Sequence, residues 1–344
     1  MTEPLISVEN LKKYYYEKNS FIHTALNIDP VTIQAVDGVD FDIHRGETLS
    51  LVGESGCGKS STGETLLRLR EPTDGSVMFD GTDIYQVDEK ELLDFRRRAQ
   101  IVFQDPSSSL DPRMTINEII QEPMIIQNKG SKEDCQNRAE ELIQEVGLSG
   151  SYLDRYPHEF SGGQQQRIVI ARALALEPDF IVLDEPVSAL DVSVQAQILN
   201  LLNNLQEKFG LTYLCIAHDL SVVRNISDRV AVMYLGEIVE IGPVKKVFED
   251  PEHPYTQALL ETVPRPSVSE QERDVEGLPG SVPSPRNPPD GCRFHTRCKY
   301  AREVCEERSP KLRQHETGQA AARCFRPDEN HEYWDSDSIN QNLL

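Results

Sequence analysis

The sequence Leu49-Ser-Leu-Val-Gly-Glu-Ser-Gly-Cys-Gly-Lys-Ser-Ser61 decides the fold of this 344-residue chain. Its apolar start predicts a buried strand, and Gly53–Ser60 fits the pattern G-x-x-x-x-G-K-[ST], which joins a strand to a helix in phosphate-binding loops. The glycines let successive backbone N–H groups approach a phosphate, and the following helix directs its positive end toward it. Lys59 would reach the β- and γ-phosphates of a nucleotide, and Ser60 would place a hydroxyl on Mg²⁺. We therefore expect an α/β fold.

A second apolar run, Phe180–Leu183, ends in two carboxylates, Asp184 and Glu185. In a phosphate-loop protein, a carboxylate at such a strand end can hold the metal through water, and the next can orient and deprotonate the attacking water. Many strands end in solvated acidic residues, so the pair alone would be weak evidence for a catalytic site. The phosphate loop in the same chain makes the catalytic interpretation strong.

The segment Phe160-Ser-Gly-Gly-Gln-Gln-Gln-Arg167 precedes a predicted helix and resembles the signature sequence of ABC-type ATPases. A serine at a helix N-cap followed by two glycines offers bare N–H groups and a positive helix end, which suits a γ-phosphate. Three further positions match the family: Gln104 the Q-loop glutamine, Ser188–Asp191 the D-loop, and His218 the switch histidine. Taken alone, His218 would more often be an ordinary histidine at a strand end.

The resemblance implies ATP hydrolysis with Mg²⁺. The implied catalytic residues are Glu185 as general base, His218 as the switch that positions water, and Gln104 as the sensor of γ-phosphate and metal. Mg²⁺ would be held by Ser60, Gln104 and Asp184. Tyr14 matches the aromatic residue that stacks on adenine, although Tyr15 and Tyr16 leave this position open by a residue or two. The implied nucleotide-binding residues are Tyr14, Ser55, Gly56, Cys57, Gly58, Lys59, Ser60, Ser61, Ser161, Gly162, Gly163, Gln164 and Asp191.

In this family two nucleotide-binding domains pack head to tail, and the signature of one closes over ATP held by the other. Only one set of motifs is present in this chain, so the resemblance implies a second, identical or related ATPase subunit. A regulatory module without hydrolysis would lack Glu185 or His218, and both are present. Soluble family members that act on nucleic acid or ribosomes carry coiled-coil insertions or two ATPase units, and neither feature is found here.

Apolar runs that alternate with helical patterns predict a mostly parallel sheet covered on both faces. The predicted strands are 5–10, 35–43, 49–52, 101–103, 180–183 and 213–216, with a hairpin of 230–235 and 237–241 around Gly236. The resemblance adds an antiparallel β portion and a helical subdomain at about 105–178. We expect three regions: a nucleotide-binding domain (1–260), a C-terminal extension with four cysteines (261–327) and an acidic tail (328–344). Seven prolines in 261–290 predict a linker or irregular segment.

Three segments resemble the ATP-binding subunits of dipeptide and oligopeptide importers: 104–115, an extended Q-loop, and 253–260 and 280–292, parts of their C-terminal extension. This resemblance implies that ATP hydrolysis drives import of peptides, with two transmembrane permease subunits and an extracellular solute-binding protein as partners. Sugars, nickel and glutathione are alternative cargoes in the same branch. The expected location is the cytoplasmic face of the cell membrane, with attachment through the permeases.

Four cysteines lie close together in the sequence: Cys292, Cys298, Cys305 and Cys324, spaced C-x5-C-x6-C-x18-C. Four cysteines in a short segment of a cytosolic protein favour metal binding over disulfides, because thiols stay reduced there. The spacing is not that of a zinc ribbon. Some members of the importer branch carry a [4Fe–4S] cluster on this cysteine set, so a cluster is the first expectation, with zinc and metal-free thiols as alternatives.

The formal net charge is −22, from 57 Asp and Glu against 35 Lys and Arg. This charge argues against nucleic acid as the main partner, since phosphates repel carboxylates. Only 12 of the basic residues are lysines. An acid-rich, lysine-poor surface predicts a halophilic source, because concentrated ions screen the repulsion between carboxylates. The alternative is an ordinary acidic protein whose tail, 328–344, adds five carboxylates.

Overall fold

The computed structural model describes residues 3–16, 31–261, 280–314 and 320–326. The predicted acidic tail and residues 262–279 of the predicted linker lie outside the described residues. Within the described ranges, every helix is too short or too polar to span a bilayer.

The strands, in chain order, are β1 (Ile6–Tyr16), β2 (Thr32–Ile43), β3 (Thr48–Val52), β4 (Asp74–Phe79), β5 (Thr82–Asp83), β6 (Ala99–Val102), β7 (Phe180–Asp184), β8 (Thr212–Ala217), β9 (Arg229–Tyr234), β10 (Glu237–Pro243), β11 (Arg313–Gln314) and β12 (Ala321–Ala322). The α-helices are α2 (Lys59–Leu66), α3 (Glu89–Arg98), α4 (Pro106–Ser109), α5 (Ile116–Ile126), α6 (Lys132–Glu145), α7 (Gly162–Leu174), α8 (Val192–Phe209), α9 (Leu220–Ile226), α10 (Val244–Glu249), α11 (Pro254–Glu261) and α12 (Glu303–Glu307). Short 3₁₀ turns are η1 (Gly150–Tyr152), η2 (Pro157–Glu159) and η3 (His295–Arg297).

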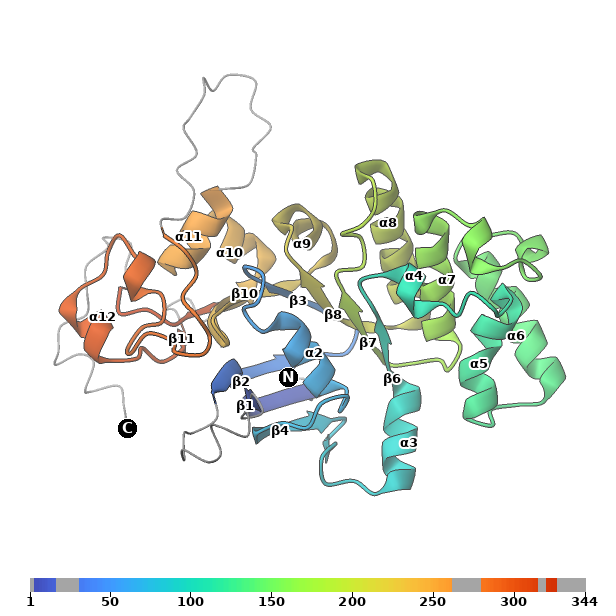
Figure 1. The fold of residues 1–344 in the computed structure, drawn as a ribbon, viewed down its shortest axis with the longest axis horizontal. Coiled ribbons are helices and arrows are strands. Elements are labelled where there is room, and N and C mark those ends of the chain that lie inside the picture. The colour runs from blue at the N-terminus through green and yellow to red at the C-terminus, as the bar shows by residue number, and fades with distance from the viewer. Residues whose placement is uncertain (1–2, 17–30, 262–279, 315–319, 327–344) are drawn as a thin grey trace, which may run out of the picture.

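The larger of two sheets has the strand order β11-β12-β10-β9-β3-β8-β7-β6 (Figure 1). Strands β9, β3, β8, β7 and β6 run parallel, and β10 returns antiparallel to β9. Every residue of β3 and β8 is buried, as expected for parallel strands covered on both faces. The phosphate loop follows β3, and the other predicted catalytic positions follow β6, β7 and β8. The parallel direction therefore brings all of them to one edge of the sheet.

A second, antiparallel sheet has the order β2-β1-β4-β5. Helix α2 packs against β1 and β2 of this sheet and against β7 and β8 of the larger one (Figure 1). The alternation of side chains in β3 joins two cores: Leu51 packs with the antiparallel sheet, whereas Val52 packs with the helices on the opposite face. The sequence predicted only residues 5–10 as the first strand, but β1 continues to Tyr16 because it pairs with β2 along this length.

Helices α4–α7 form a helical group beside β6 and β7 (Figure 1). Residues close in the sequence determine where α5 and α6 begin. Thr115 and Glu118 form a capping box on α5, and Ser131 and Asp134 form one on α6, so backbone N–H groups at both helix starts have partners. Apolar side chains of α5, α6 and α7 share one core with the larger sheet.

The C-terminal segment adds strands to the larger sheet at the β10 edge. Ala321 and Ala322 of β12 pair antiparallel with Ile241 and Glu240 of β10, and β11 pairs with β12. A two-residue strand has too short a pattern to be predicted, and the sequence predicted no strand beyond residue 241. This pairing holds the segment against the nucleotide-binding domain.

Candidate active site

The phosphate loop between β3 and α2 is closed by its lysine. Lys59 Nζ donates to the carbonyl oxygens of Gly53 (2.8 Å) and Glu54 (3.1 Å). Two glycines are required by close backbone approach: a Cβ at Gly53 would lie 2.1 Å from the Met233 carbonyl oxygen, and one at Gly58 would lie 2.0 Å from that of Ala35. Both positions also have positive φ, which suits glycine.

The remaining loop residues differ in exposure. Ser55, Gly56 and Ser60 are exposed, whereas Cys57 is buried. Burial raises the pKa of the Cys57 thiol above its usual value, so the thiol is protonated at neutral pH. The Cys57 side chain therefore packs inside the loop.

Two predicted metal-binding residues lie in contact. Ser60 Oγ, at the start of α2, donates to Asp184 Oδ1, at the end of β7, over 3.2 Å. Burial raises the pKa of Asp184, and the neighbouring Glu185 adds to this increase. A hydroxyl and a carboxylate oxygen are hard ligands that suit Mg²⁺. The donor set therefore fits the metal that the family implies.

Glu185 is the point on which the predicted catalytic residues converge. Gln104 Nε2 donates to Glu185 Oε2 (2.8 Å), and His218 Nδ1 lies 3.1 Å from the same oxygen. The three residues follow β6, β7 and β8. The Glu185 side chain is 18% exposed and that of His218 56%, so the group opens to solvent. The Glu185 N–H donates to the Ile216 carbonyl oxygen (3.0 Å), which fixes the backbone of Glu185 beside the end of β8.

The predicted signature residues belong to the helical group and begin α7. Ser161 is the N-cap of α7, its N–H donates to Gln164 Oε1 (3.0 Å), and Gly162 and Gly163 form the first turn. Helix α7 belongs to the helical group, whereas α2 lies between the two sheets (Figure 1). Gly163 is needed for packing, since a Cβ there would lie 2.5 Å from a Val194 methyl group. Asp191, from the predicted D-loop, occupies the N-cap position of α8.

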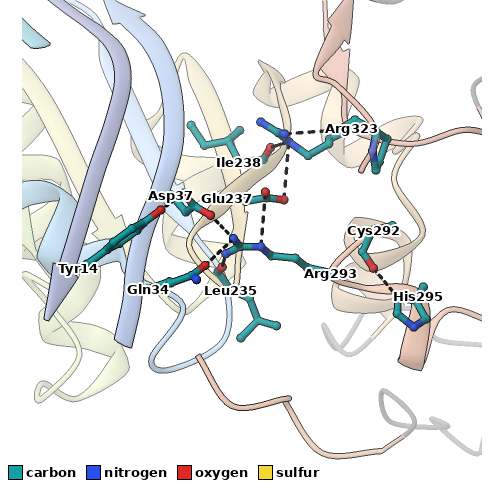
Figure 2. A network of polar contacts seen from close by, with 11 residues as sticks. Tyr14, Gln34, Asp37, Leu235, Glu237, Ile238, Cys292, Arg293, His295 and Arg323 are labelled. Atoms are coloured by element: carbon teal, nitrogen blue, oxygen red, sulfur yellow. Dashed lines mark hydrogen bonds and ion pairs between the residues drawn. The ribbon is translucent and has the colours of Figure 1, made fainter. Parts of the chain in front are cut away.

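The three consecutive tyrosines of β1 have different surroundings. The Tyr14 hydroxyl donates to Asp37, which also pairs with Arg293 (Figure 2). The Tyr15 hydroxyl lies 3.3 Å from Ser61 Oγ, next to the phosphate loop. Tyr16 is 58% exposed. The sequence pattern could not separate these residues, because alternation along a strand decides which face each occupies.

The four C-terminal cysteines line one cavity together with Phe294 and Phe325. All four are free thiols, and burial raises the pKa of Cys292 and of Cys324 to about 12. However, within the part of the chain that the structure describes, no three His, Cys, Asp or Glu side chains are grouped closely enough to hold a metal ion. The cavity thus brings the four cysteines together, whereas their grouping gives no support for the predicted [4Fe–4S] cluster or for a zinc ion.

Comparison with known proteins shows which family the chain resembles. A family model described as ABC transporter matches residues 36–188, and one described as oligopeptide/dipeptide transporter, C-terminal region, matches residues 239–305. The oligopeptide transport ATP-binding protein AppF of Bacillus subtilis is 50% identical over 317 residues, which cover 91% of this chain and 94% of the relative. The dipeptide transport ATP-binding protein DppF of Haemophilus influenzae is 48% identical, with 94% and 97% covered. The dimeric bacterial ABC transporter cassette MJ0796 shares 33% identity and a TM-score of 0.60, over 70% of this chain and 98% of that one.

The fold and the grouping around Glu185 thus define an ATPase of the ATP-binding cassette class, with a P-loop α/β fold of mixed sheets and helices. Within this class, the chain belongs to the family of oligopeptide and dipeptide transport ATP-binding proteins.

Proposed function

We propose that this chain hydrolyses ATP to energise the import of dipeptides or oligopeptides. The observation that carries the proposal is the Glu185 carboxylate, held between Gln104 and His218 beside the Ser60–Asp184 pair. Relatives named for oligopeptide and dipeptide transport favour a peptide cargo over sugar, nickel or glutathione. They also favour a transporter subunit over a soluble ABC ATPase without a transport role.

Each residue of the site has a part in the proposed hydrolysis. Lys59 and the loop N–H groups bind the phosphates, and Ser60, Asp184 and Gln104 would hold Mg²⁺, which neutralises phosphate charge when bound. Glu185 accepts a proton from the attacking water, and His218 orients that water. The Gln104 and His218 contacts keep the Glu185 oxygen at the position where this proton is taken.

The separation of α7, which carries the signature, from α2, which follows the phosphate loop, supports an assembly of two ATPase subunits (Figure 1). We infer that Ser161, Gly162, Gly163, Gln164 and Asp191 act on ATP bound by a second ATPase subunit, identical or related. Two permease subunits would hold the pair at the cytoplasmic face of the membrane, and an extracellular solute-binding protein would deliver the cargo. The proposed regions remain a nucleotide-binding domain at 1–260, containing the helical subdomain at 105–178, an extension at 261–327 and a tail at 328–344.

The test of this function is ATP hydrolysis by the complete transporter reconstituted in vesicles with its solute-binding protein. Peptide-loaded binding protein should raise the ATPase rate, and peptide should accumulate in the compartment that holds the ATPase subunits. Identification of the ligand that copurifies with the binding protein would name the cargo. Stimulation by a sugar, nickel or glutathione, but not by peptide, would contradict the peptide assignment.

We propose that adenine stacks on Tyr15 rather than on Tyr14. Tyr15 contacts Ser61 beside the phosphate loop, whereas the Tyr14 hydroxyl is engaged by Asp37. Stacking of a base on an aromatic ring is worth ~1–3 kcal/mol, so Tyr15→Ala should raise the Kd for ATP by about 10-fold. Tyr16→Ala is the matched control and should change it little. If Tyr15→Ala binds ATP as tightly as the wild type and Tyr14→Ala binds it more weakly, then adenine stacks on Tyr14, as the sequence predicted.

The role of the cysteine cavity stays a prediction with three alternatives. A [4Fe–4S] cluster or a zinc ion would require the cysteine thiols to lose their protons, because thiolates are the ligands of both. Iron and acid-labile sulfide analysis of anaerobically purified protein distinguishes the alternatives. Iron and sulfide in equal amounts support the cluster, zinc alone supports a zinc site, and neither supports free thiols.

We propose that the acid excess adapts the chain to concentrated salt. Raising KCl from about 0.1 M to about 1 M shortens the screening length from about 10 Å to about 3 Å, so repulsion among carboxylates weakens. The unfolding midpoint should then rise by about 5 °C. A variant that ends at residue 327 tests the alternative. If this variant loses the salt response, the tail explains it, and an unchanged midpoint in the full chain would contradict salt adaptation.

A further inference from the structure

Two buried arginines join the C-terminal segment to the nucleotide-binding domain. They lie in the turn Cys292–Cys298, and their side chains are 9% (Arg293) and 4% (Arg297) exposed. Arg293 contacts Asp37, Gln34 and Glu237 and donates to the Leu235 carbonyl oxygen (Figure 2). This network fixes the turn against β2 and the β9–β10 hairpin. Arg297, four residues later, reaches the phosphate loop itself.

The contact of Arg297 is a bidentate ion pair with Glu54, the second residue of the phosphate loop. Its Nη1 lies 2.7 Å from Glu54 Oε2, and its Nη2 lies 3.1 Å from Oε1. Nη1 also lies 3.4 Å from the Tyr234 hydroxyl. A planar guanidinium that binds both oxygens of one carboxylate fixes its orientation as well as its charge. Because the guanidinium is buried, loss of either partner would leave the other charge uncompensated.

The backbone of Glu54 is held at two further points. Its N–H donates to the Tyr255 hydroxyl (2.9 Å), and its carbonyl oxygen accepts from Lys59 Nζ (3.1 Å). Lys59 is the residue that would bind the β- and γ-phosphates. The conformation of Glu54 is therefore coupled to the position of the phosphate-binding lysine. The Glu54 side chain is 24% exposed, so without its partner it would place a negative charge beside the incoming triphosphate.

We propose that Arg297 is a positioning residue of the ATP site. It neutralises Glu54 and fixes it in place, so that the phosphate loop accepts the triphosphate, and it makes the C-terminal segment part of the ATP-binding machinery. The proposal rests on the proposed ATP binding and adds a residue that lies outside the motifs of the nucleotide-binding domain.

The test compares single and double variants of the full chain. The Kd for a fluorescent ATP analogue is measured well below the unfolding midpoint, together with KM and kcat for hydrolysis. Arg297→Gln should raise Kd and KM by about 10-fold, because a carboxylate then faces the phosphates, while kcat changes less than KM. The double variant Arg297→Gln/Glu54→Gln should recover to within about 3-fold of the wild-type Kd, because no charge is left unpaired. Glu54→Gln alone should lower the unfolding midpoint, because it leaves the buried Arg297 guanidinium uncompensated. Arg297→Lys should recover only part of the affinity, because an ammonium group cannot bind both carboxylate oxygens in one plane.

Arg308→Gln is the matched control, since it removes an exposed arginine of the same segment, and it should leave Kd unchanged. Wild-type affinity in Arg297→Gln would overturn the proposal. So would a folded double variant that binds as weakly as Arg297→Gln, because the loss would then come from the missing arginine and not from the exposed carboxylate. If the wild type itself binds no ATP, the proposed function is wrong, and this result is distinct from a failure of the positioning role, which requires a wild type that binds ATP.

Discussion

Glu185→Gln should lower the rate of ATP hydrolysis by about 100-fold or more while ATP still binds. The amide has nearly the shape of the carboxylate, but it cannot accept a proton from the attacking water. The phosphate loop and the Ser60–Asp184 pair are untouched by this change. We therefore expect the variant to accumulate in the ATP-bound form. The measurement is single-turnover hydrolysis of labelled ATP, with the Kd for nucleotide determined in parallel.

The matched control for this prediction is Glu207→Gln, which removes an exposed carboxylate from α8 and should hydrolyse ATP at the wild-type rate. Turnover in Glu185→Gln within a few-fold of the wild type would contradict the general-base assignment. It would leave His218, whose Nδ1 lies 3.1 Å from the Glu185 carboxylate, as the candidate base.

The central strands could be predicted from the sequence because local signals and burial agree there. β3, β7 and β8 are short, largely apolar and largely buried runs, and the structure places them side by side in the larger sheet. The full length of β1 and the pairing of β12 with β10 could not be predicted. Both depend on partner strands distant in the chain, and an edge strand of two residues has no periodicity to read.

The residues of the candidate site also fall into two groups, those that could be predicted from the sequence and those that could not. Residues inside motifs, such as Lys59 and Glu185, could be placed because the motif prescribes a strand end. The Arg297–Glu54 pair could not, because its members are separated by 243 positions and neither residue type is unusual where it stands. The only local signal was a carboxylate inside a loop that must bind phosphates. Such a charge calls for a cationic partner, but the sequence alone does not say which of its 35 lysines and arginines supplies it.

The second large effect concerns the signature. Ser161→Asp should reduce ATP hydrolysis by about 100-fold, because it places a negative charge where the γ-phosphate of the other subunit's ATP is expected. Aspartate is as good an N-cap as serine, so α7 should keep its start and the unfolding midpoint should stay within about 2 °C. Ser149→Asp is the matched control: it alters an exposed cap on the helical group, at η1, and should leave hydrolysis unchanged.

Mixing the two inactive variants shows whether the signature acts in trans. In a head-to-tail dimer of Ser161→Asp with Glu185→Gln, one site combines an intact Glu185 with an intact Ser161, and the other site carries both changes. The mixture should therefore hydrolyse ATP well above either variant alone. Where a related subunit replaces the second copy, Ser161→Asp in this chain should instead silence the site of that partner. If the mixed dimers form, bind ATP and stay as inactive as the separate variants, the signature does not act on ATP bound by the other subunit. The separation of α7 from α2 would then have to be closed by a movement of the helical group within one chain.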